Sequence, residues 1–531
     1  MKKIFIALAL LLALQPAQAQ KSFEDLSLQE KTGQTLFASA DINNYERLKP
    51  YITKGLLGGV LIQWGNYSRE ETKKLTENLQ TWAKESPNKI PLLIAIDYEG
   101  GTVYSPTTLG LPFLLSNMVI AAANNYEDTQ TIFYIIAQEL RNLGIHINFA
   151  PVMDVNTNSQ NPIIGVRSFG SKKETVATMG KAIIEGLQQG GIMSVAKHFP
   201  GHGEANTDTH KGLTEFNGTK KEFEEIHLYP FKEAIKSGVQ GIMTSHIRYS
   251  FLDYRLATYS PVILQDLLRK KLDFKGLIFT DSLDMKGALL SNISKAAYLS
   301  LKAGADVALI AKEDPQKAIT LIQQKVPAQR IEEAAKKVYD AKKELGLFEK
   351  NTNKEMPVNK AFEALARKIT QQAVTVVKNE DNLIPYQPQD GKNKLCAVFF
   401  APTRLANQLP YFVQPFLNEK FEVEYYNAPL TPKQKDIERA KNCALKADLV
   451  VIGSLQWANK EVAAQKKAIE ELLNLNGNTV ILSLMSPYDL KHYPQAQTAL
   501  AIYGVNSFSA TAAAEVILGK IKPKGQLPIN F

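Results

Sequence analysis

The segment 197–210, KHFPGHGEANTDTH, concentrates the side-chain types that move protons in enzymes. The chain has seven histidines in 531 residues, and three of them, His198, His202 and His210, lie within these fourteen positions. Asp208 and His210 are separated by one residue, so in an extended loop both side chains project to the same side, within hydrogen-bonding reach. The carboxylate stabilises the protonated ring, so we expect His210 to act as a general acid and then as a base, oriented by Asp208.

Asp281 supplies a second reactive group. It follows the apolar segment GLIF at 276–279, so its carboxylate is expected at the end of a buried strand. A nucleophilic carboxylate opposite a proton donor meets the requirement of retaining glycoside hydrolysis, which two acids usually fulfil. Here a His–Asp pair takes the place of the second acid.

The histidines and acids of segment 197–210 are also types that bind metals in barrel enzymes. The segment has no H-x-H or H-E-x-x-H spacing, however, and Lys197 places a cation beside any metal bound there. We therefore predict a site without metal or cofactor, in which His202 and Glu204 shape the loop.

Short apolar segments alternate with amphipathic helical stretches from about residue 56 onward. Runs that are apolar throughout are typical of strands covered on both faces, and hence of a parallel sheet with helices outside it. These segments are GGVLIQ, PLLIAID, HINFAPVMDV, IMSVAKHF, QGIMTSH, KGLIFTD and ADVALIA. They predict a (β/α)8 TIM-type barrel, with an irregular eighth strand in TGQTLFASAD at 32–41. An open doubly wound sheet is the alternative, but GLLGGV at 55–60 does not match its phosphate-binding turn.

Polar residues follow several of these strand segments: Asp97, Lys197, His198, His246 and Asp281. Any one of them alone can be a capping or salt-bridged residue. In a barrel, however, the carboxyl ends of the strands meet at one face, where catalytic groups lie. Their joint occurrence therefore predicts one site at that face.

The pattern changes at LFEKNTNKEMPVNK, residues 347–360, a polar stretch with a proline that is typical of a linker. We predict a barrel domain at 20–348, a linker at 349–358 and a second domain at 359–531. Further apolar segments in the second half, such as LCAVFF, DLVVIGS and TVILSL, predict a smaller α/β three-layer sandwich. Its segment SLQWANKE, 454–461, is the candidate for a loop that reaches the site.

Residues 1–19 have the features of a secretory signal peptide. Two lysines precede an apolar run, and AQA at 17–19 is a small-x-small cleavage site. This predicts an exported protein, periplasmic or secreted. The apolar run is short for a bilayer span and no cysteine follows the cut, so no stable membrane anchor is expected.

The composition further limits the class of partner. The 62 basic residues are spread along the chain without a basic block, so nucleic-acid binding is not expected despite the formal charge of +9. Oligomeric state cannot be derived from the sequence. Cys396 lies in an apolar segment and Cys443 in a helical one. An oxidising compartment permits a disulfide, but we predict two buried, unpaired cysteines.

The chain resembles glycoside hydrolase family 3, in particular its β-N-acetylglucosaminidase branch of the peptidoglycan-recycling type. The resemblance rests on IDYEGG, NFAPVMDVNTN, IGVRSFG, KHFPGHGEANTDTH, IMTSH and FTDSLDMKGA, in family order along the barrel. The second half, from VVKNEDNLIP to the terminal GQLPINF, also resembles the family's sandwich domain. The branch commonly has Gln and Arg where this chain has Tyr98 and Thr102. Its recycling enzymes are often cytosolic and single-domain, unlike this chain.

The resemblance implies roles for matching residues. Asp281 would be the nucleophile and His210 with Asp208 the acid/base dyad. The hydroxyls of the sugar in the −1 subsite would be held by Asp97, Arg167, Lys197 and His198. Arg167 and Lys197 can alternatively, or also, form ion pairs with Asp97 or Asp154.

The expected activity is that of a retaining exo-β-N-acetylglucosaminidase. It would release N-acetylglucosamine from the non-reducing ends of cell-wall fragments, muropeptides or related oligosaccharides, with this small carbohydrate as its only expected partner. Three alternatives remain: a β-N-acetylglucosaminide phosphorylase, a β-glucosidase or β-xylosidase of the same family, and a sugar-binding protein without turnover.

Overall fold

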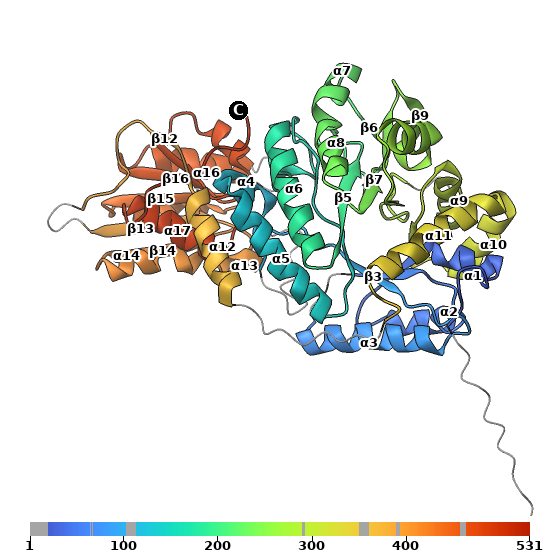
Figure 1. The fold of residues 1–531 in the computed structure, drawn as a ribbon. Helices are drawn as coiled ribbons and strands as arrows, with labels where there is room; N and C mark the ends of the chain where they lie inside the picture. The colour runs from blue at the N-terminus through green and yellow to red at the C-terminus, as the bar shows by residue number, and fades with distance from the viewer. Residues whose placement is uncertain are drawn as a thin grey trace, which may run out of the picture.

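The computed structural model describes residues 20–63, 65, 67–101, 113–288, 292–349, 360–388, 393–456 and 463–531 (Figure 1). The predicted signal peptide, Thr102 and all but the first residue of the predicted linker lie outside these ranges. Residues 457–461 of the candidate second-domain loop lie outside them too. Within the described ranges, every helix is too short or too polar to cross a membrane.

Eight parallel strands form a closed barrel, in their order along the chain. Each of the first six strands pairs with the next, and the eighth pairs with the first. A bridge between Phe279 and Val307 closes the remaining seam. The strands are β1 (Leu36–Ala40), β2 (Gly59–Ile62), β3 (Leu93–Ile96), β4 (Ile147–Asn148), β5 (Met193–Phe199), β7 (Gly241–Thr244), β10 (Leu277–Phe279) and β11 (Ala308–Ala311). The prediction of a TIM-type barrel is confirmed.

The irregular strand is not the one that the sequence indicated. The segment 32–41 contains β1, which is fully buried and pairs in continuous register with β2, with one register shift against β11. The shortest strand is instead β4, two residues long, in the predicted segment HINFAPVMDV. Pro151 follows it and has no N–H to donate, so pairing resumes only as a bridge from Val152 to Lys197.

The barrel interior is filled by side chains from alternate strand positions. Phe279 packs edge to face against Phe37 and Phe149, with ring centroids 5.8 and 5.4 Å apart. Leu61, Leu93 and other apolar residues complete this layer. The polar groups beyond it therefore lie on a packed apolar layer.

Helices cover the outside of the barrel. The 17-residue α3 shows why they form: Ser68 and Glu71 make a capping box at its start, and Leu75 and Leu79 lie buried on its inner face. The barrel helices are α1 (Leu28–Gln34), α2 (Lys49–Ile52), α3 (Arg69–Glu85), α4 (Asn117–Ala123), α5 (Tyr126–Asn142), α6 (Lys173–Gln189), α7 (Lys220–Glu222), α8 (Tyr229–Lys236), α9 (Ile293–Ala303), α10 (Pro315–Lys325) and α11 (Ala328–Glu344).

Short helical turns and a small three-stranded sheet, in the order β6-β8-β9, complete the barrel domain. The strands of this sheet are β6 (Thr214–Glu215), β8 (Ile247–Tyr249) and β9 (Asp253–Leu256). The turns are η1 (Tyr45–Leu48), η2 (Gly165–Arg167), η3 (Phe223–His227), η4 (Ala257–Tyr259) and η5 (Val262–Lys271).

The second domain is a six-stranded sheet between two helical layers, as predicted. The strand order is β12-β17-β16-β15-β13-β14, and only β12 runs antiparallel to its neighbour. The strands are β12 (Thr375–Asn379), β13 (Lys394–Phe400), β14 (Glu422–Ala428), β15 (Leu449–Ser454), β16 (Thr479–Ser483) and β17 (Thr498–Ala501). The helices are α12 (Lys360–Ala373), α13 (Thr403–Ala406), η6 (Leu409–Phe412), α14 (Gln414–Asn418), α15 (Gln434–Ala444), α16 (Ala463–Leu473), η7 (Pro487–His492) and α17 (Ser507–Ile517).

The expectation of two unpaired cysteines is wrong. Cys396 and Cys443 form a disulfide, with their Cα atoms 5.6 Å apart. Alternate residues of β13 face opposite helical layers, and Cys396 faces the layer that contains α15. Because α15 crosses this face of the sheet, it places Cys443 directly over Cys396.

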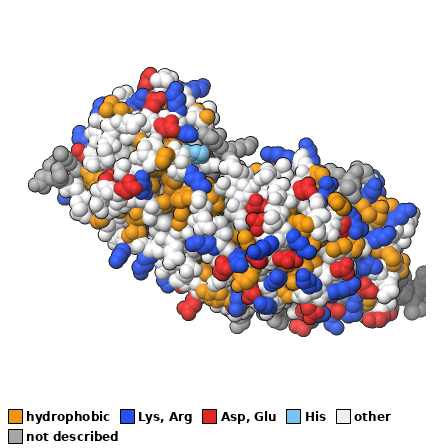
Figure 2. Space-filling model, turned by 90° about the horizontal axis from the view of Figure 1, so that it is seen from above, with side chains coloured by type: hydrophobic (Ala, Val, Ile, Leu, Met, Phe, Trp, Pro, Cys, Tyr) orange, Lys and Arg blue, Asp and Glu red, His pale blue; other side chains and the backbone are white. Residues whose placement is uncertain are grey.

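The two domains share one apolar core. Helix α12 packs on α4 and α5 of the barrel, and one continuous cluster of buried side chains includes residues of both domains. Seen from above, Lys and Arg side chains are interspersed with Asp and Glu over the surface (Figure 2). This face carries no extended patch of one charge sign.

Candidate active site

The carboxyl ends of the barrel strands bring the predicted residues to one end of the barrel. Asp97 follows β3, Lys197 and His198 lie within β5, His246 follows β7, and Asp281 follows β10. Parallel strands in a barrel end at the same face, which explains why positions up to 184 residues apart share one site.

Glu99 organises the cationic side of this site. It accepts two hydrogen bonds from Arg167, from Nε and Nη2, both at 2.8 Å, and its Oε1 lies 2.6 Å from Lys197 Nζ. Lys197 also donates to Asp97 Oδ1 at 2.6 Å. Burial alone would raise the pKa of Glu99, but the charges of Arg167 and Lys197 lower it, so the carboxylate stays ionised.

Asp97 and Glu99 differ in how far their carboxylates are exposed to solvent. The side chain of Glu99 is 1% exposed and that of Asp97 is 28% exposed. Burial lowers the pKa of Lys197, but Asp97 and Glu99 raise it above its ordinary value, so the ammonium stays charged. Asp97 is therefore the carboxylate that a ligand can reach, while Glu99 fixes the two cations.

His198 is oriented by Asp154. The ring lies with Nδ1 2.7 Å from Asp154 Oδ2, and Arg167 Nη2 lies 3.4 Å from Nε2. The ring is thus held from both sides, by the carboxylate at Nδ1 and by the guanidinium at Nε2. Asp154 also accepts from the backbone N–H of His202 at 2.6 Å. Burial raises the pKa of Asp154, but His198 and the His202 groups lower it overall.

These contacts decide between the ion pairs that the sequence left open. Lys197 does pair with Asp97, as one alternative had it. Arg167 pairs with Glu99 rather than with Asp97 or Asp154. Asp154 serves the two histidines instead.

Asp281 is held as a carboxylate at the end of β10. Its Oδ1 accepts from the backbone N–H of Ser282 at 2.7 Å. Burial would raise its pKa, but His198, His246, the Ser282 N–H and Lys197 together lower it below its ordinary value. His246 is buried beside it and is held by Thr258 Oγ1 at 2.8 Å and the Ser282 carbonyl at 3.1 Å. Asp281 is thus ionised at neutral pH.

Asp208 and His210 are in contact, but not for the reason expected from an extended loop. His210 Nδ1 lies 2.8 Å from Asp208 Oδ1, which also accepts from the His210 backbone N–H at 2.9 Å. The Asp208 carbonyl accepts from Lys211 N–H at 2.8 Å. The segment is therefore a turn closed by an aspartate side chain. The His210 side chain is 49% exposed, against 13% for Asp208.

Thr209, between the two dyad residues, ties their turn to the rest of the site. Its carbonyl accepts from the backbone N–H of Gly287 at 2.9 Å, which joins the turn to the segment after Asp281. Its hydroxyl lies 3.4 Å from His202 Nε2, which is buried. The buried His202 ring thus contacts the turn that carries Asp208 and His210 through Thr209. Glu204 bonds Thr157 in a neighbouring loop, so it too shapes the loop.

Glu99 was not among the residues expected at the site. His246 was expected at this face without a stated role, and Asp154 only as a possible ion-pair partner. Asp97 and Glu99 are two positions apart after β3, so alternation along an extended segment was a signal that both face the site. The same alternation places Tyr98 on the opposite side, where it is fully buried. The departure from the family pattern at Tyr98 therefore lies behind the site rather than in it.

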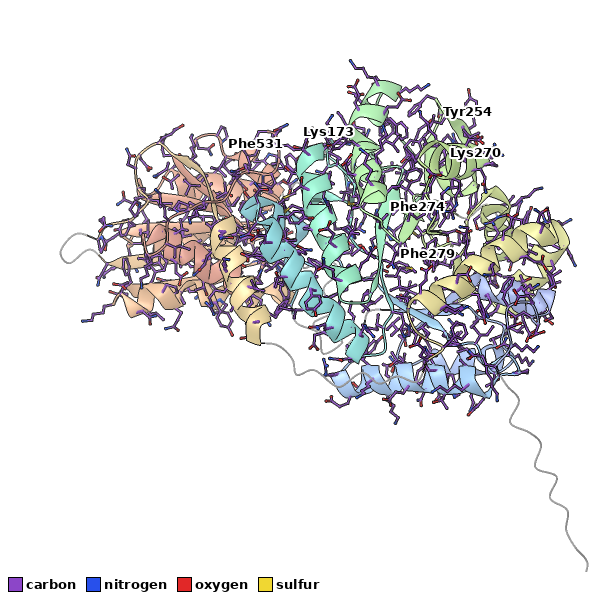
Figure 3. The ribbon with its side chains drawn as sticks, in the orientation of Figure 1. Lys173, Tyr254, Lys270, Phe274, Phe279 and Phe531 are labelled. Atoms are coloured by element: carbon purple, nitrogen blue, oxygen red, sulfur yellow. A yellow bond between two sulfur atoms is a disulfide. The ribbon has the colours of Figure 1, made fainter. Side chains whose placement is uncertain are left out.

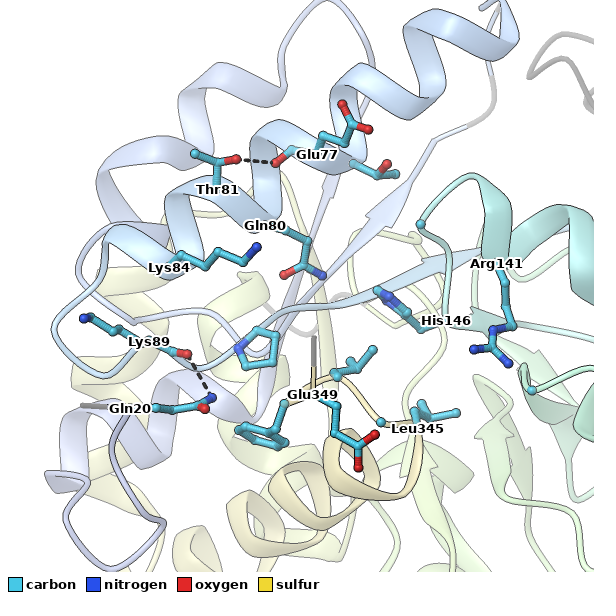
Figure 4. Close-up of a pocket in the computed structure, with 17 residues that line it drawn as sticks. Gln20, Glu77, Gln80, Thr81, Lys84, Lys89, Arg141, His146, Leu345 and Glu349 are labelled. Atoms are coloured by element: carbon cyan, nitrogen blue, oxygen red, sulfur yellow. Dashed lines mark hydrogen bonds between the residues drawn. The ribbon is translucent and has the colours of Figure 1, made fainter. Parts of the chain in front are cut away.

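The described residues contain no group of three or more His, Cys, Asp and Glu side chains arranged to hold a metal ion. A cavity of about 920 Å³ lies at the opposite end of the barrel, lined by Gln80, Arg141, His146 and Leu345 among others (Figure 4). It borders Glu349, next to the undescribed linker residues, and contains none of the groups described above.

Comparisons with known proteins agree with this arrangement. The family model described as "Glycosyl hydrolase family 3 N terminal domain" matches residues 27–341. A β-hexosaminidase A from Pseudoalteromonas piscicida is 29% identical over 91% of this chain and 90% of its own. A β-hexosaminidase from Nitrosomonas eutropha is 36% identical over 50% of this chain and 77% of its own. The structure of a family 3 β-N-acetylglucosaminidase from Paenibacillus sp. str. FPU-7 superposes with a TM-score of 0.85 at 26% identity, over 95% of this chain and 99% of that one.

Proposed function

Because the chain belongs to glycosyl hydrolase family 3, we propose that it is a retaining exo-β-N-acetylglucosaminidase. One observation carries this proposal: a His210–Asp208 pair in direct contact at 2.8 Å, on the barrel face that also holds the ionised Asp281. A nucleophilic carboxylate and a separate proton donor are the two groups that the retaining reaction needs. The names of the relatives support N-acetylglucosamine as the sugar.

In the first step, a carboxylate oxygen of Asp281 attacks the anomeric carbon of the bound sugar. The bond from that carbon to the leaving oxygen breaks, and His210 transfers its Nε2 proton to this oxygen. Nδ1 remains with Asp208, so the carboxylate stabilises the protonated ring before transfer and fixes its orientation. The product of this step is a covalent glycosyl ester of Asp281.

In the second step, neutral His210 takes a proton from a water molecule. The water oxygen bonds to the anomeric carbon, and the Asp281 carboxylate leaves. Two inversions at one carbon restore the original β configuration. Because His210 is half exposed, water and the aglycone both have access to it from solvent.

The cationic side of the site binds the −1 sugar in this proposal. Asp97 accepts from sugar hydroxyls, Arg167 and Lys197 donate to hydroxyl oxygens, and His198 hydrogen-bonds a hydroxyl through its ring. Glu99 keeps Arg167 and Lys197 in place without touching the sugar, because its own oxygens are already occupied.

We further propose an exported enzyme, periplasmic or secreted, that acts on non-reducing ends of cell-wall fragments or related oligosaccharides during peptidoglycan turnover. The signal sequence predicted at 1–19 supports export. The disulfide between Cys396 and Cys443 is consistent with it, since such bonds persist in oxidising compartments.

Hydrolysis of p-nitrophenyl N-acetyl-β-glucosaminide by the mature chain tests the proposal. We expect turnover by the wild type, its loss in Asp281→Asn and a strong reduction in His210→Ala. A 2-deoxy-2-fluoro glycoside should label Asp281 in a mass-spectrometric peptide map, and a label elsewhere would disprove the mechanism.

The same assay separates the alternatives. Sugar-1-phosphate formed in phosphate buffer would identify a phosphorylase, since a neutral histidine does not repel incoming phosphate as a carboxylate does. Faster cleavage of the β-glucoside or β-xyloside would identify that activity instead. Calorimetric binding of N-acetylglucosamine without any turnover would identify a binding protein.

A further inference from the structure

We propose that the second domain positions the −1 subsite. Tyr488 and the terminal residues 528–530 hold the barrel loop 154–171 in the conformation that presents His198 and Arg167 to the sugar. The inference rests on the proposed function only in treating these two residues as sugar ligands.

The loop 154–171 carries both sides of the subsite. It begins with Asp154, which orients His198, and it contains Arg167, which pairs with Glu99. Ser168 fastens its two ends together, since its hydroxyl donates to the Asp154 carbonyl at 2.6 Å and contacts the Gly170 carbonyl at 2.9 Å. A displacement of either end therefore moves Asp154 and Arg167 together.

The C-terminal tail bonds the far end of this loop. Ser171 N–H donates to the Pro528 carbonyl at 3.0 Å, and Asn530 N–H donates to Ser171 Oγ at 2.9 Å. Phe531, the last residue, lies on the same side of the molecule as Lys173 at the start of α6 (Figure 3). A Cβ atom on Gly170 would stand 2.0 Å from the Pro528 carbonyl oxygen, so the tail and the loop meet with no space for a side chain.

Tyr488 bonds the near end of the loop. It lies in η7 of the second domain, is 4% exposed, and donates its hydroxyl to the Asn156 carbonyl at 3.3 Å. Asn156 is two residues from Asp154, and its N–H donates to the Gly170 carbonyl at 2.9 Å. The second domain thus bonds both ends of the loop 154–171, at Asn156 and at Ser171.

A third contact reaches Arg167 through helix α4. Ser116 donates its hydroxyl to the Tyr503 carbonyl of the second domain at 2.7 Å. The next residue, Asn117, donates from Nδ2 to the Arg167 carbonyl at 2.6 Å. The contacts from Tyr488 and through α4 are buried, whereas the bond from Asn530 to Ser171 Oγ is exposed. Each contact includes a bond to a backbone carbonyl, so together they hold the loop backbone.

Gly170→Ala in the full chain is the direct test. The new methyl group must displace either the tail or the loop, and the backbone at φ +134° favours glycine. Gly238→Ala is the matched control, because Gly238 also has a positive φ, +77°, but open space around its Cβ position. Active sites are first counted by covalent trapping, and kcat/KM is expressed per trapped site.

We expect kcat/KM per site to fall about tenfold or more in Gly170→Ala, with weaker inhibition by N-acetylglucosamine. Gly238→Ala should keep the wild-type value. A purely structural role would lower the number of active sites or the Tm while leaving kcat/KM per site unchanged. An unchanged value per site would therefore overturn the inference.

Hydrogen exchange of peptides covering 154–171 provides a readout that does not depend on activity. Gly170→Ala and Tyr488→Phe should both exchange faster there than the wild type, and Gly238→Ala should not. If the wild type does not hydrolyse N-acetylglucosaminides, only the proposed function is contradicted, because the comparison of hydrogen exchange does not depend on activity. Equal exchange in all four proteins would contradict the positioning role.

Discussion

Glu99 and Arg167 form a bidentate ion pair inside the carboxyl end of the barrel, with both nitrogen–oxygen distances at 2.8 Å. Lys197 adds a second cation to the same carboxylate at 2.6 Å. The Glu99 side chain is 1% exposed and that of Arg167 is 6% exposed, so water has little access to the pair. Glu99 thus determines where two of the proposed sugar ligands lie, while its own oxygens are occupied by Arg167 and Lys197.

Glu99→Gln should damage both folding and activity. Removing one charge leaves Arg167 and Lys197 buried with only Asp97 as counter-ion, which costs about 3–5 kcal/mol of unfolding free energy. The displaced cations should lower kcat/KM about a hundredfold. Urea unfolding and steady-state kinetics measure the two effects.

Glu139→Gln is the control for the folding cost alone. Glu139 forms another ion pair, with Arg69 at 2.7 Å, between α3 and α5 outside the site. Its own side chain is 3% exposed and that of Arg69 is 24% exposed. It should lose stability but keep kcat/KM. If both variants lose activity equally at a temperature where both are folded, Glu99 has no special role in the site.

Gly287→Ala should disturb the dyad without touching it. A Cβ atom there would lie 2.6 Å from the Thr209 carbonyl and 2.7 Å from that of Gly212, both backbone atoms of the dyad turn. A shifted His210 protonates the leaving oxygen less well, so kcat should fall at least about tenfold on aglycones that need protonation. Kinetics with aryl glycosides of different leaving-group pKa values measure this.

Two outcomes distinguish displacement of the acid from general damage. Aglycones that leave without protonation should be cleaved almost as fast by Gly287→Ala as by the wild type. Gly477→Ala, with open space at its Cβ position, should behave as the wild type on all substrates. Equal losses across all aglycones would contradict the link between Gly287 and the dyad.

Stability should fall between pH 7 and pH 5 because buried histidines, His202 and His227 among them, resist protonation. Burial lowers the pKa of His202 and of His227 to about 4. In the unfolded chain each titrates near its ordinary value of about 6.5, so the unfolded state binds more protons in this window. Each histidine makes its full contribution to the free energy of unfolding above about pH 6.5, and this contribution is lost as the pH falls toward 4.

Each histidine should account for roughly 2 kcal/mol of the loss by pH 5. Urea unfolding at a series of pH values measures the slope for the wild type, His202→Gln and His227→Gln. Each variant should be less stable than the wild type at pH 7 and should show a shallower slope. If the unfolding free energy of both variants depends on pH as steeply as that of the wild type, groups other than these two histidines govern the sensitivity to acid.

The barrel and most of its site were predictable because they depend on local sequence. Strands covered on both faces must be apolar throughout, and polar groups that follow them must meet at one end. This placed Lys197, His198 and Asp281 correctly at the carboxyl face. The Asp208-x-His210 spacing likewise predicted contact, although the turn that produces it was not expected.

Features that depend on contacts distant in sequence were not predictable in the same way. Glu99 and Arg167 are separated by 68 positions, and nothing local to either chooses the partner. Cys396 and Cys443 are separated by 47, and only the crossing of α15 over β13 brings them together. The bonds between the loop 154–171 and the terminal residues join segments more than 350 positions apart.

Reduction of the Cys396–Cys443 bond should destabilise the second domain. Closing a loop of this length removes unfolded-state entropy worth about 4 kcal/mol in the chain-entropy description. Unfolding followed with and without reductant should therefore show a lower Tm in the reduced protein. Cys396→Ala with Cys443→Ala should reproduce the lower Tm and no longer respond to reductant.

Activity at 25 °C should survive this loss. Cys396 faces the helical layer of α15 and α16, whereas α12, in the other layer, makes the contact with the barrel. The bonds from Tyr488 and Pro528 to the barrel loop therefore remain when the disulfide is broken. A fall in kcat/KM per active site on reduction, in protein that is still folded, would show that the helical layer containing α15 also affects the geometry of the barrel site.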